Sequence, residues 1–298
     1  MTTIDSASVY RYAKIAQLVY YVNDVNERDK RTTELAQLGC NVDLGSIRSE
    51  TSWKSFKFDA FQAVCVTYGD KLIVAYRGTN NKRVEDLTTD AGIINICSTP
   101  TSGAMLRSLI ERATGKKTWN NWFRSTFIPM IPVPVIPTAI SSVHIDGLGG
   151  RLLLAIEYYN NSVNPRRNQF SEIIVVGHSL GGLIASYVAY KNDTIAHTFD
   201  SAPGVKYTLE ENYRNVDGDK ASKIFNHRII GDPISGPPGM LNDRGFPYGH
   251  MGCIFNWKSP NKCSGFDCHN LDLLINTQFD ESQYLEASAE APTTNFFW

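Results

Sequence analysis

A short segment near the middle of the chain strongly limits the fold. An apolar run, Ile173–Val176, leads into Gly177-His178-Ser179-Leu180-Gly181-Gly182, and a helix-like stretch over residues 180–190 follows. The order strand, G-x-S-x-G, helix is the context that a nucleophile elbow requires. Glycines fit at 177 and 181 because side chains there would collide across the turn. The segment predicts a strand–turn–helix unit with Ser179 as candidate nucleophile; the alternative is an ordinary turn with a helix-capping serine.

Strand-like and helix-like segments alternate along much of the chain. This alternation favours an α/β fold with a largely parallel central sheet flanked by helices. No linker or repeat interrupts the pattern, so we expect a single domain over residues 1–298. The expected helices cover residues 7–22, 103–114, 147–159 and 180–190; the expected strands cover residues 56–67, 71–77, 170–176, 195–199, 223–228 and 254–257.

Charge and composition exclude several classes of protein. The chain has 29 Lys and Arg against 30 Asp and Glu, a net charge of −1. Without a basic excess to neutralise phosphates, a nucleic-acid partner is disfavoured. The N-terminal residues lack the basic segment and continuous apolar core of a secretory signal peptide. The default expectation is therefore a cytoplasmic protein, or a secreted one if a leader was removed.

One apolar segment differs from the rest of the chain. Phe127–Ile140 carries no charge and contains four prolines. A transmembrane helix needs about 20 apolar residues, and prolines at this density break helices. We therefore expect an apolar loop and no membrane span. The loop either packs on the core or forms a mobile cover or lipid-contacting surface.

The cysteines leave the disulfide pattern open. Six are present, and six cysteines allow 15 connectivities if all of them pair. Cys263 and Cys268 together with His269 resemble part of a zinc site, but no second ligand pair accompanies them. We therefore expect no metal. The six are Cys40, Cys65, Cys97, Cys253, Cys263 and Cys268.

Candidates for a catalytic acid and base follow Ser179 in the sequence. On a nucleophile elbow the expected chain order is serine, acid, histidine. Asp200 and Asp232 both follow strand-like runs, so either is a candidate acid. With Asp232 as the acid, the base is His250 or His269, and the position of His269 beyond the last strand-like run favours it. The N–H of Leu180, at a helix N-terminus, is a candidate oxyanion donor.

Several further segments occur in a characteristic order. Together with Gly177–Gly182, they resemble the class 3 lipase family, the fungal-type triacylglycerol lipases of the α/β-hydrolase superfamily. The segments are Ile73–Thr79, which ends in R-G-T, the acidic Glu85–Asp90, Val143–Gly147, Thr198–Gly204, Asp232–Ile234, Gly249–Gly252 and His269–Leu271.

The resemblance implies specific roles. It assigns the catalytic triad to Ser179, Asp232 and His269. It also implies that Thr79 is a second oxyanion donor besides Leu180, and that Asp200 has a structural role. It also implies the α/β-hydrolase fold and a reaction without metal or organic cofactor. The segment between Asp90 and Val143 matches nothing in the family, so we expect an enlarged lid at about residues 91–142.

These observations predict a serine carboxylic-ester hydrolase that acts on lipid esters such as triacylglycerols, at a lipid–water interface. Phospholipase A1 or lysophospholipase activity is the alternative, since the same site can cleave either substrate. A catalytically inactive lipid-binding or interaction protein is an alternative of another class. A serine peptidase or thioesterase fits the triad but not the R-G-T strand.

Overall fold

The computed structural model describes residues 5–50, 61–78, 151–202, 217–232, 234–235, 250–258, 263, 265–279 and 284–288. Three of the sequence-based predictions lie outside these residues: the helix at 103–114, the lid at 91–142 and the position of Thr79. The extent of the single domain over residues 1–298 likewise stays a prediction.

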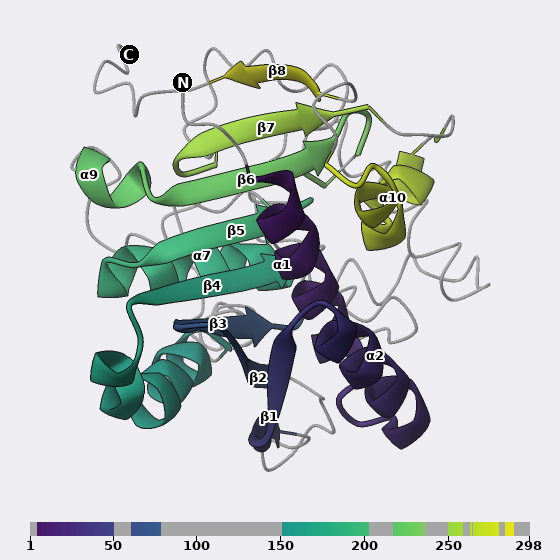
Figure 1. Ribbon diagram of the computed structural model, residues 1–298. Coiled ribbons are helices and arrows are strands. Elements are labelled where there is room, and N and C mark those ends of the chain that lie inside the picture. The colour runs from purple at the N-terminus through teal and green to yellow at the C-terminus, as the bar shows by residue number, and fades with distance from the viewer. Residues whose placement is uncertain are drawn as a thin grey trace, which may run out of the picture.

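The described residues form one mixed sheet in which strand order follows chain order (Figure 1). Strands β3 to β7 run parallel, whereas β1 and β2 at one edge and β8 at the other pair antiparallel. The expected α/β class with a largely parallel centre is thus confirmed. The strands are β1 (Cys40–Glu50), β2 (Phe61–Tyr68), β3 (Lys71–Tyr76), β4 (Glu172–His178), β5 (Ile195–Phe199), β6 (Ile224–Ile229), β7 (Cys253–Trp257) and β8 (Tyr284–Ser288).

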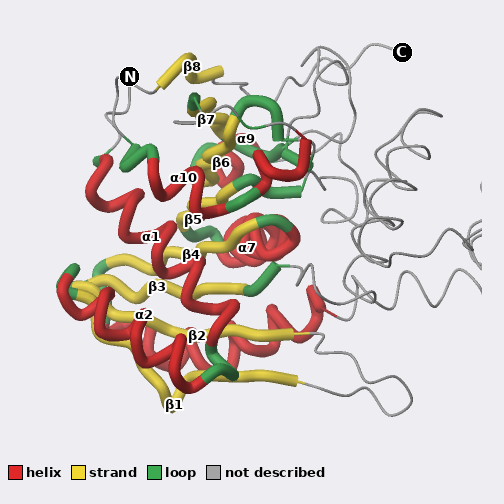
Figure 2. Tube along the Cα trace, turned by 90° about the vertical axis from the view of Figure 1, so that its right-hand side faces the viewer, coloured by secondary structure: helices red, strands yellow, loops and turns green. Residues whose placement is uncertain are grey.

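Helices cover both faces of the sheet, as Figures 1 and 2 show from two directions. Helices α1 (Ser6–Leu18), α2 (Val25–Gln37) and α10 (Leu271–Asn276) lie on one face, and α7 (Leu180–Asn192) lies on the other. Residues 151–158 are also helical. The shorter pieces are α9 (Gly218–Ala221) and the helical turns Val19–Tyr21, Tyr159–Val163, Asn164–Gln169 and Gly265–His269.

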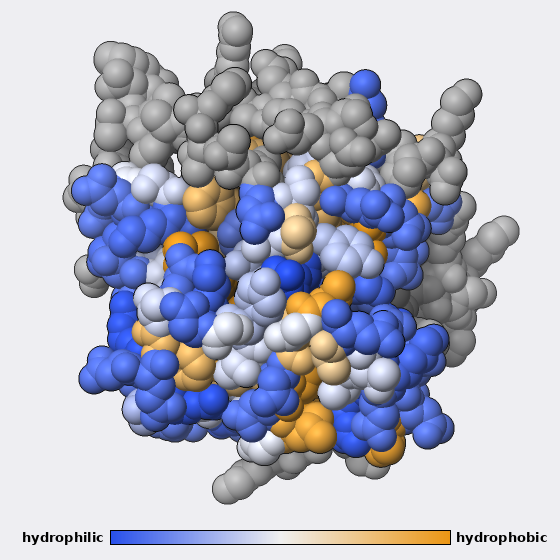
Figure 3. All heavy atoms as spheres, viewed as in Figure 1, coloured by the Kyte–Doolittle hydropathy of each residue, from blue (hydrophilic) through white to orange (hydrophobic). Residues whose placement is uncertain are grey.

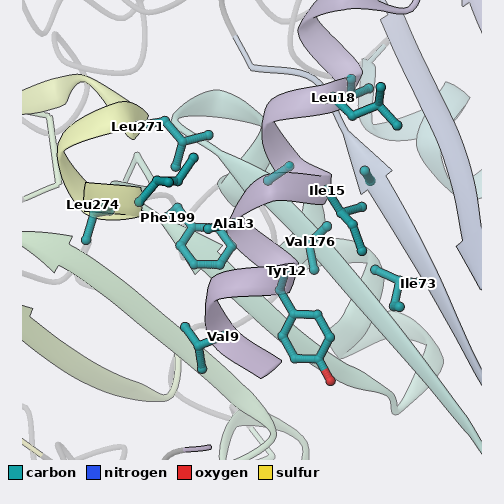
Figure 4. Packing of buried hydrophobic residues seen from close by; sticks show 14 of the residues in the cluster. Val9, Tyr12, Ala13, Ile15, Leu18, Ile73, Val176, Phe199, Leu271 and Leu274 are labelled. Atoms are coloured by element: carbon teal, nitrogen blue, oxygen red, sulfur yellow. The ribbon is translucent and has the colours of Figure 1, made fainter. Parts of the chain in front are cut away.

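The central strands are apolar on both faces because both faces are buried. Alternate side chains of β3 and β4 enter two separate cores: Ile73 and Val176 face α1, whereas Leu72 and Val175 pack with α7. Figure 4 shows the first core, where Val9 and Ala13 of α1 gather with Phe199 at the end of β5 and with Leu271 and Leu274 of α10. This two-sided packing holds the ends of β4 and β5 at fixed positions.

The outer surface of the α1–α2 layer is mostly hydrophilic, with small scattered hydrophobic areas (Figure 3). Among the residues described, none of the helices combines the length and apolar character needed to cross a bilayer.

Candidate active site

The candidate catalytic residues lie beyond the carboxyl ends of the parallel strands. Ser179 directly follows β4, Asp232 follows β6 by a short turn, and His269 directly precedes the N-cap of α10. Because β3 to β7 are parallel, their carboxyl ends lie on the same side of the sheet. Open α/β sheets place their ligand-binding sites there.

Ser179 has the backbone conformation of a sharp strand-to-helix turn. Its φ of 59° and ψ of −129° lie outside the regions that a non-glycine residue normally adopts. Such a residue costs roughly 1–3 kcal/mol and persists only when its surroundings fix it. Its N–H donates to the Phe199 carbonyl at 3.0 Å, and its own carbonyl accepts from Gly182 at 2.9 Å and from Ala202 at 3.2 Å. The end of β5, the residues that follow it and the first turn of α7 therefore hold the strained turn in place.

The two glycines expected at this turn are sterically required. A Cβ at Gly177 would collide with the Gly181 carbonyl oxygen, and a Cβ at Gly181 would collide with the Tyr76 carbonyl oxygen. The predicted collision across the turn is thus confirmed for Gly177, whereas Gly181 is required because β3 and the residues after it pass close by.

His269 joins the serine to an aspartate. Its Nε2 lies 2.8 Å from Ser179 Oγ, and its Nδ1 lies 3.0 Å from Asp232 Oδ1. An ionised carboxylate only accepts hydrogen bonds, so Nδ1 carries the proton and donates to Asp232. In the neutral ring Nε2 is then free to accept the proton of the Ser179 hydroxyl. The arrangement can deprotonate the serine as it attacks.

Asp232 is fully buried yet surrounded by donors. Oδ1 accepts from His269 and from the Ile234 N–H at 3.0 Å; Oδ2 accepts from the Ser235 N–H at 3.0 Å and from the Ser235 hydroxyl. Burial alone would raise the pKa of Asp232, but the charge of His269 and these hydrogen bonds outweigh it, and the pKa lies below its usual value. Asp232 is therefore ionised at neutral pH.

His178, which sequence reasoning did not single out, braces the candidate base. Its Nε2 donates to the His269 carbonyl oxygen at 3.1 Å, and its Nδ1 lies 2.9 Å from the Tyr20 hydroxyl. Burial, reinforced by the neighbouring His269, lowers the pKa of His178 to about 3. The ring is therefore neutral, and Tyr20 donates to Nδ1. The available signal was its position between Gly177 and Ser179, but its contact with residue 269 has no trace in the sequence.

The two rival candidates have other partners. His250 Nε2 donates to the Ser235 carbonyl oxygen at 2.8 Å, and burial lowers the pKa of His250 to about 4. Asp200 Oδ1 accepts from the Ile229 N–H at 2.8 Å. The structure thus brings Asp232 rather than Asp200 to His269, and His269 rather than His250 to Ser179.

Cys263 and Cys268 form a disulfide that closes the loop just before His269. This pairing was not predicted, and it removes both thiols from the weak zinc pattern considered from sequence. No group of three or more possible metal ligands occurs in the described part of the chain. Cys40, Cys65 and Cys253 are free thiols, and Cys97 lies outside the described residues.

The candidate oxyanion donors are described only in part. Leu180 is the first residue of α7, and N–H groups in a first helical turn have no acceptor within the helix. Gly78, which precedes Thr79, lies against the Ser179 turn: a Cβ on it would stand 3.1 Å from Ser179 Cβ. The role of Thr79 itself stays a prediction.

Comparison with known proteins adds two solved structures. No protein-family model matches the chain, and no curated protein sequence matches it. Lipase II from Rhizopus niveus aligns with a TM-score of 0.45 and 15% identity, over 86% of this chain and 82% of that chain. M37 lipase aligns with a TM-score of 0.34 and 12% identity, over 97% of this chain and 83% of that chain. Both TM-scores are below 0.5, so the assignment below depends on the residues and geometry of the site.

Proposed function

We propose that this protein is a serine carboxylic-ester hydrolase of the α/β-hydrolase type, with Ser179, Asp232 and His269 as its catalytic triad. The observation that carries the proposal is the unbroken hydrogen-bonded chain from Ser179 Oγ through His269 to Asp232, with contacts of 2.8 and 3.0 Å. It is built on a strained serine at the carboxyl end of a parallel strand, where a nucleophile elbow belongs.

The reaction follows from this geometry. His269 Nε2 takes the Ser179 proton as Oγ attacks the ester carbonyl carbon, and the carbonyl oxygen becomes an oxyanion. Leu180 N–H, with Thr79 as second donor, stabilises that charge. The intermediate collapses, and the leaving alcohol receives the proton from Nε2. Water then attacks the acyl-enzyme as His269 takes its proton. The bond between the acyl carbon and Ser179 Oγ breaks, Oγ receives that proton from His269, and the carboxylic acid leaves. Asp232 stays ionised throughout, and no metal or organic cofactor is needed.

The substrate class we propose is a lipid ester, with triacylglycerol or another acylglycerol first and a phospholipid cleaved at an acyl ester second. Its support is the ordered resemblance of Ile73–Thr79, Gly177–Gly182 and His269–Leu271 to the class 3 lipase family. The apolar, uncharged Phe127–Ile140 supports it further, because such a segment suits a lid within residues 91–142 that meets a lipid surface. A catalytically inactive lipid-binding protein is the competing proposal.

Replacing the nucleophile separates the enzyme from the inactive protein. Ser179→Ala should lower the hydrolysis rate of a p-nitrophenyl ester by on the order of 10⁶, since triad members act as a unit. A fluorophosphonate should label the wild type at Ser179 and leave the variant unlabelled. Ser186→Ala, within the helix that Ser179 precedes and also buried, is the control and should hydrolyse and label normally. Substantial activity in a folded Ser179→Ala protein contradicts the proposal.

The same assay, extended to emulsified triglycerides and phospholipids, tests the substrate class and the lid. We expect the rate on one ester to rise sharply above its aggregation point, because a lipid surface stabilises an open lid. Ile131→Ser with Val135→Ser, both in the apolar segment, should blunt that rise. A rate that follows monomer concentration smoothly in both proteins contradicts the lid, and no activity on any lipid ester contradicts the substrate class.

A further inference from the structure

The Ser235 hydroxyl lies between two buried carboxyl groups. Ser235 Oγ is hydrogen-bonded to Asp232 Oδ2 and lies 3.4 Å from Asp200 Oδ1. Both aspartates have no solvent exposure. Asp232 belongs to the proposed triad, whereas the mechanism above does not use Asp200.

The three side chains of this cluster need more hydrogen-bond donors than the Ser235 hydroxyl alone can supply. The Ser235 hydroxyl has one hydrogen and two carboxyl neighbours, so it cannot donate to both. Asp232 already accepts from His269 and from two backbone N–H groups. Among the contacts described, Asp200 Oδ1 accepts from the Ile229 N–H at 2.8 Å and has only the longer 3.4 Å contact with Ser235 besides, and Asp200 Oδ2 is buried without a hydrogen-bond partner. If Asp200 carries a proton at Oδ1 and donates it to Ser235 Oγ, the Ser235 hydroxyl accepts from Asp200 and donates to Asp232, and no negative charge is left on the buried Oδ2 that lacks a donor.

Electrostatics agrees with this placement of the proton. Two carboxylates in one buried site repel each other, so one of them stays protonated. Burial, followed by the charge of Asp232, raises the pKa of Asp200 well above its usual value. The Ile229 N–H and Arg228 act in the opposite direction, as a Ser235 hydroxyl that donated to Asp200 also would, but all of these effects are weaker.

Arg228 and His250 contact the backbone carbonyl oxygen of Ser235. The Ser235 carbonyl accepts from Arg228 at 3.1 Å and from His250 at 2.8 Å. Burial keeps His250 neutral, with its pKa lowered to about 4. Arg228 therefore contacts the backbone carbonyl of Ser235. The Ser235 hydroxyl contacts the two aspartates.

We propose that Asp200 is a positioning residue of the triad: it holds a proton and donates through the Ser235 hydroxyl, which in turn fixes the Asp232 carboxylate toward His269. The proposal rests on the proposed function, and it assigns one negative charge to the two-aspartate cluster. Asp200 then donates to Ser235, and Ser235 donates to Asp232 Oδ2. His269 Nδ1 donates to the other oxygen of the Asp232 carboxylate.

The backbone at Asp200 permits a clean test. Its φ of 41° is in the left-handed region, which asparagine and glycine both tolerate. Asn is neutral, like a protonated Asp, and keeps either a donor or an acceptor at the Oδ1 position that faces both Ser235 and the Ile229 N–H, whereas Gly keeps neither. Asp193 is the matched control, because its φ is 51° but its side chain is exposed and pairs with Lys223 at 2.8 Å.

Infrared spectroscopy tests the proton without any activity. At pH 8 the wild type should show the carbonyl stretching band of a protonated carboxyl group. Asp200→Asn and Asp200→Gly should lose this band, and Asp193→Asn and Asp193→Gly should keep it. Survival of the band in Asp200→Asn overturns the proposal. If the wild type hydrolyses no ester, the proposed function fails, while the band still reports on the proton.

Kinetics tests the positioning role. Asp200→Gly should lower kcat by roughly tenfold with KM unchanged, because a displaced Asp232 misplaces His269 and Asp200 does not touch substrate. Asp200→Asn should restore part of that loss, because it keeps one of the two hydrogen-bonding functions at Oδ1. It should also keep the midpoint of the acid limb of the kcat/KM profile, because no charge is removed. A downward shift of that midpoint by about one pH unit in Asp200→Asn shows that Asp200 was an anion and overturns the proposal. Melting temperatures of all four variants confirm that they are folded.

Discussion

His269 and His250 differ in what their ring nitrogens contact. His269 lies between Ser179 and Asp232, whereas His250 donates to the Ser235 carbonyl oxygen. We therefore predict that His269→Ala is nearly as damaging as Ser179→Ala, by on the order of 10⁶ in kcat. His250→Ala loses only a brace of Ser235 and should cost much less. Measuring kcat on one ester for each variant decides: an inactive His250→Ala protein beside an active His269→Ala protein reverses the assignment.

Residue identity and chain order were enough to name Ser179, Asp232 and His269 as candidates. They were not enough to exclude Asp200 and His250, because spacing along the chain does not say which side chain of a turn faces the serine. Ser235 was missed, although Asp232-Pro233-Ile234-Ser235 is typical of a turn in which an aspartate accepts from its own backbone two residues on. Its contact with Asp200 has no local signal at all.

Elements with a continuous apolar character were the predictable ones. The expected strands at 71–77, 170–176 and 195–199 agree with β3, β4 and β5 to within two residues, because both faces of these strands are buried. The edge strand β1 was not predicted, since its residues are mostly half-buried or exposed and show no clear alternation. Helix α2 was missed because it is largely polar, with Leu35 alone fully buried among its residues.

The cap of α2 offered a signal that hydrophobic periodicity did not. Asp24 accepts from the Glu27 N–H at 3.2 Å, and an aspartate followed three residues later by glutamate is a recognised helix start. Polar helices at the rim of a sheet are thus better found from their caps than from their apolar residues.

The turn between β4 and α7 is coupled to the start of α10 by His178, which holds the His269 carbonyl. We predict that His178→Phe, which keeps the ring but removes this donor, lowers kcat by roughly tenfold through misplacement of His269. Tyr20→Phe removes only the hydroxyl that contacts Nδ1 of His178 and should have a smaller effect. Tyr12→Phe, on α1 against His197, is the control. A wild-type kcat in a folded His178→Phe protein contradicts the brace.

At the scale of the molecule, the sequence predicted the class of the sheet and the strand at 56–67 that overlaps β2, but not the outermost strands β1 and β8. Alternating strands and helices imply right-handed parallel crossovers, and these account for β3 to β7 in chain order. The antiparallel strands at the two edges, β1 and β2 on one side and β8 on the other, are joined to their neighbours by loops, and loop geometry decides the direction of each strand. Loops are specified by few residues, so their paths are the least predictable part of the chain.

The molecule also buries neutral histidines, which couples its stability to pH. His178 and His227 lie in the core facing α1, and burial first of all lowers the pKa of both, that of His178 to about 3 and that of His227 well below its usual value. In the unfolded chain a histidine takes up its proton near pH 6.5. Between that pH and the folded pKa the unfolded state binds more protons, so the free energy of unfolding falls as pH falls.

We predict that each of these histidines removes about 2 kcal/mol of stability between pH 7 and pH 5. His227 offers the clean test, because its ring stacks against Phe199 and Phe255, and phenylalanine suits that site. Urea unfolding of His227→Phe at the two pH values should show a loss about 2 kcal/mol smaller than that of the wild type. The variant leaves His197 without its 3.0 Å contact to His227, which lowers stability at both pH values and so does not enter the difference. If the free energy of unfolding of the variant falls as steeply as that of the wild type, His227 is not one of the groups that take up a proton on unfolding.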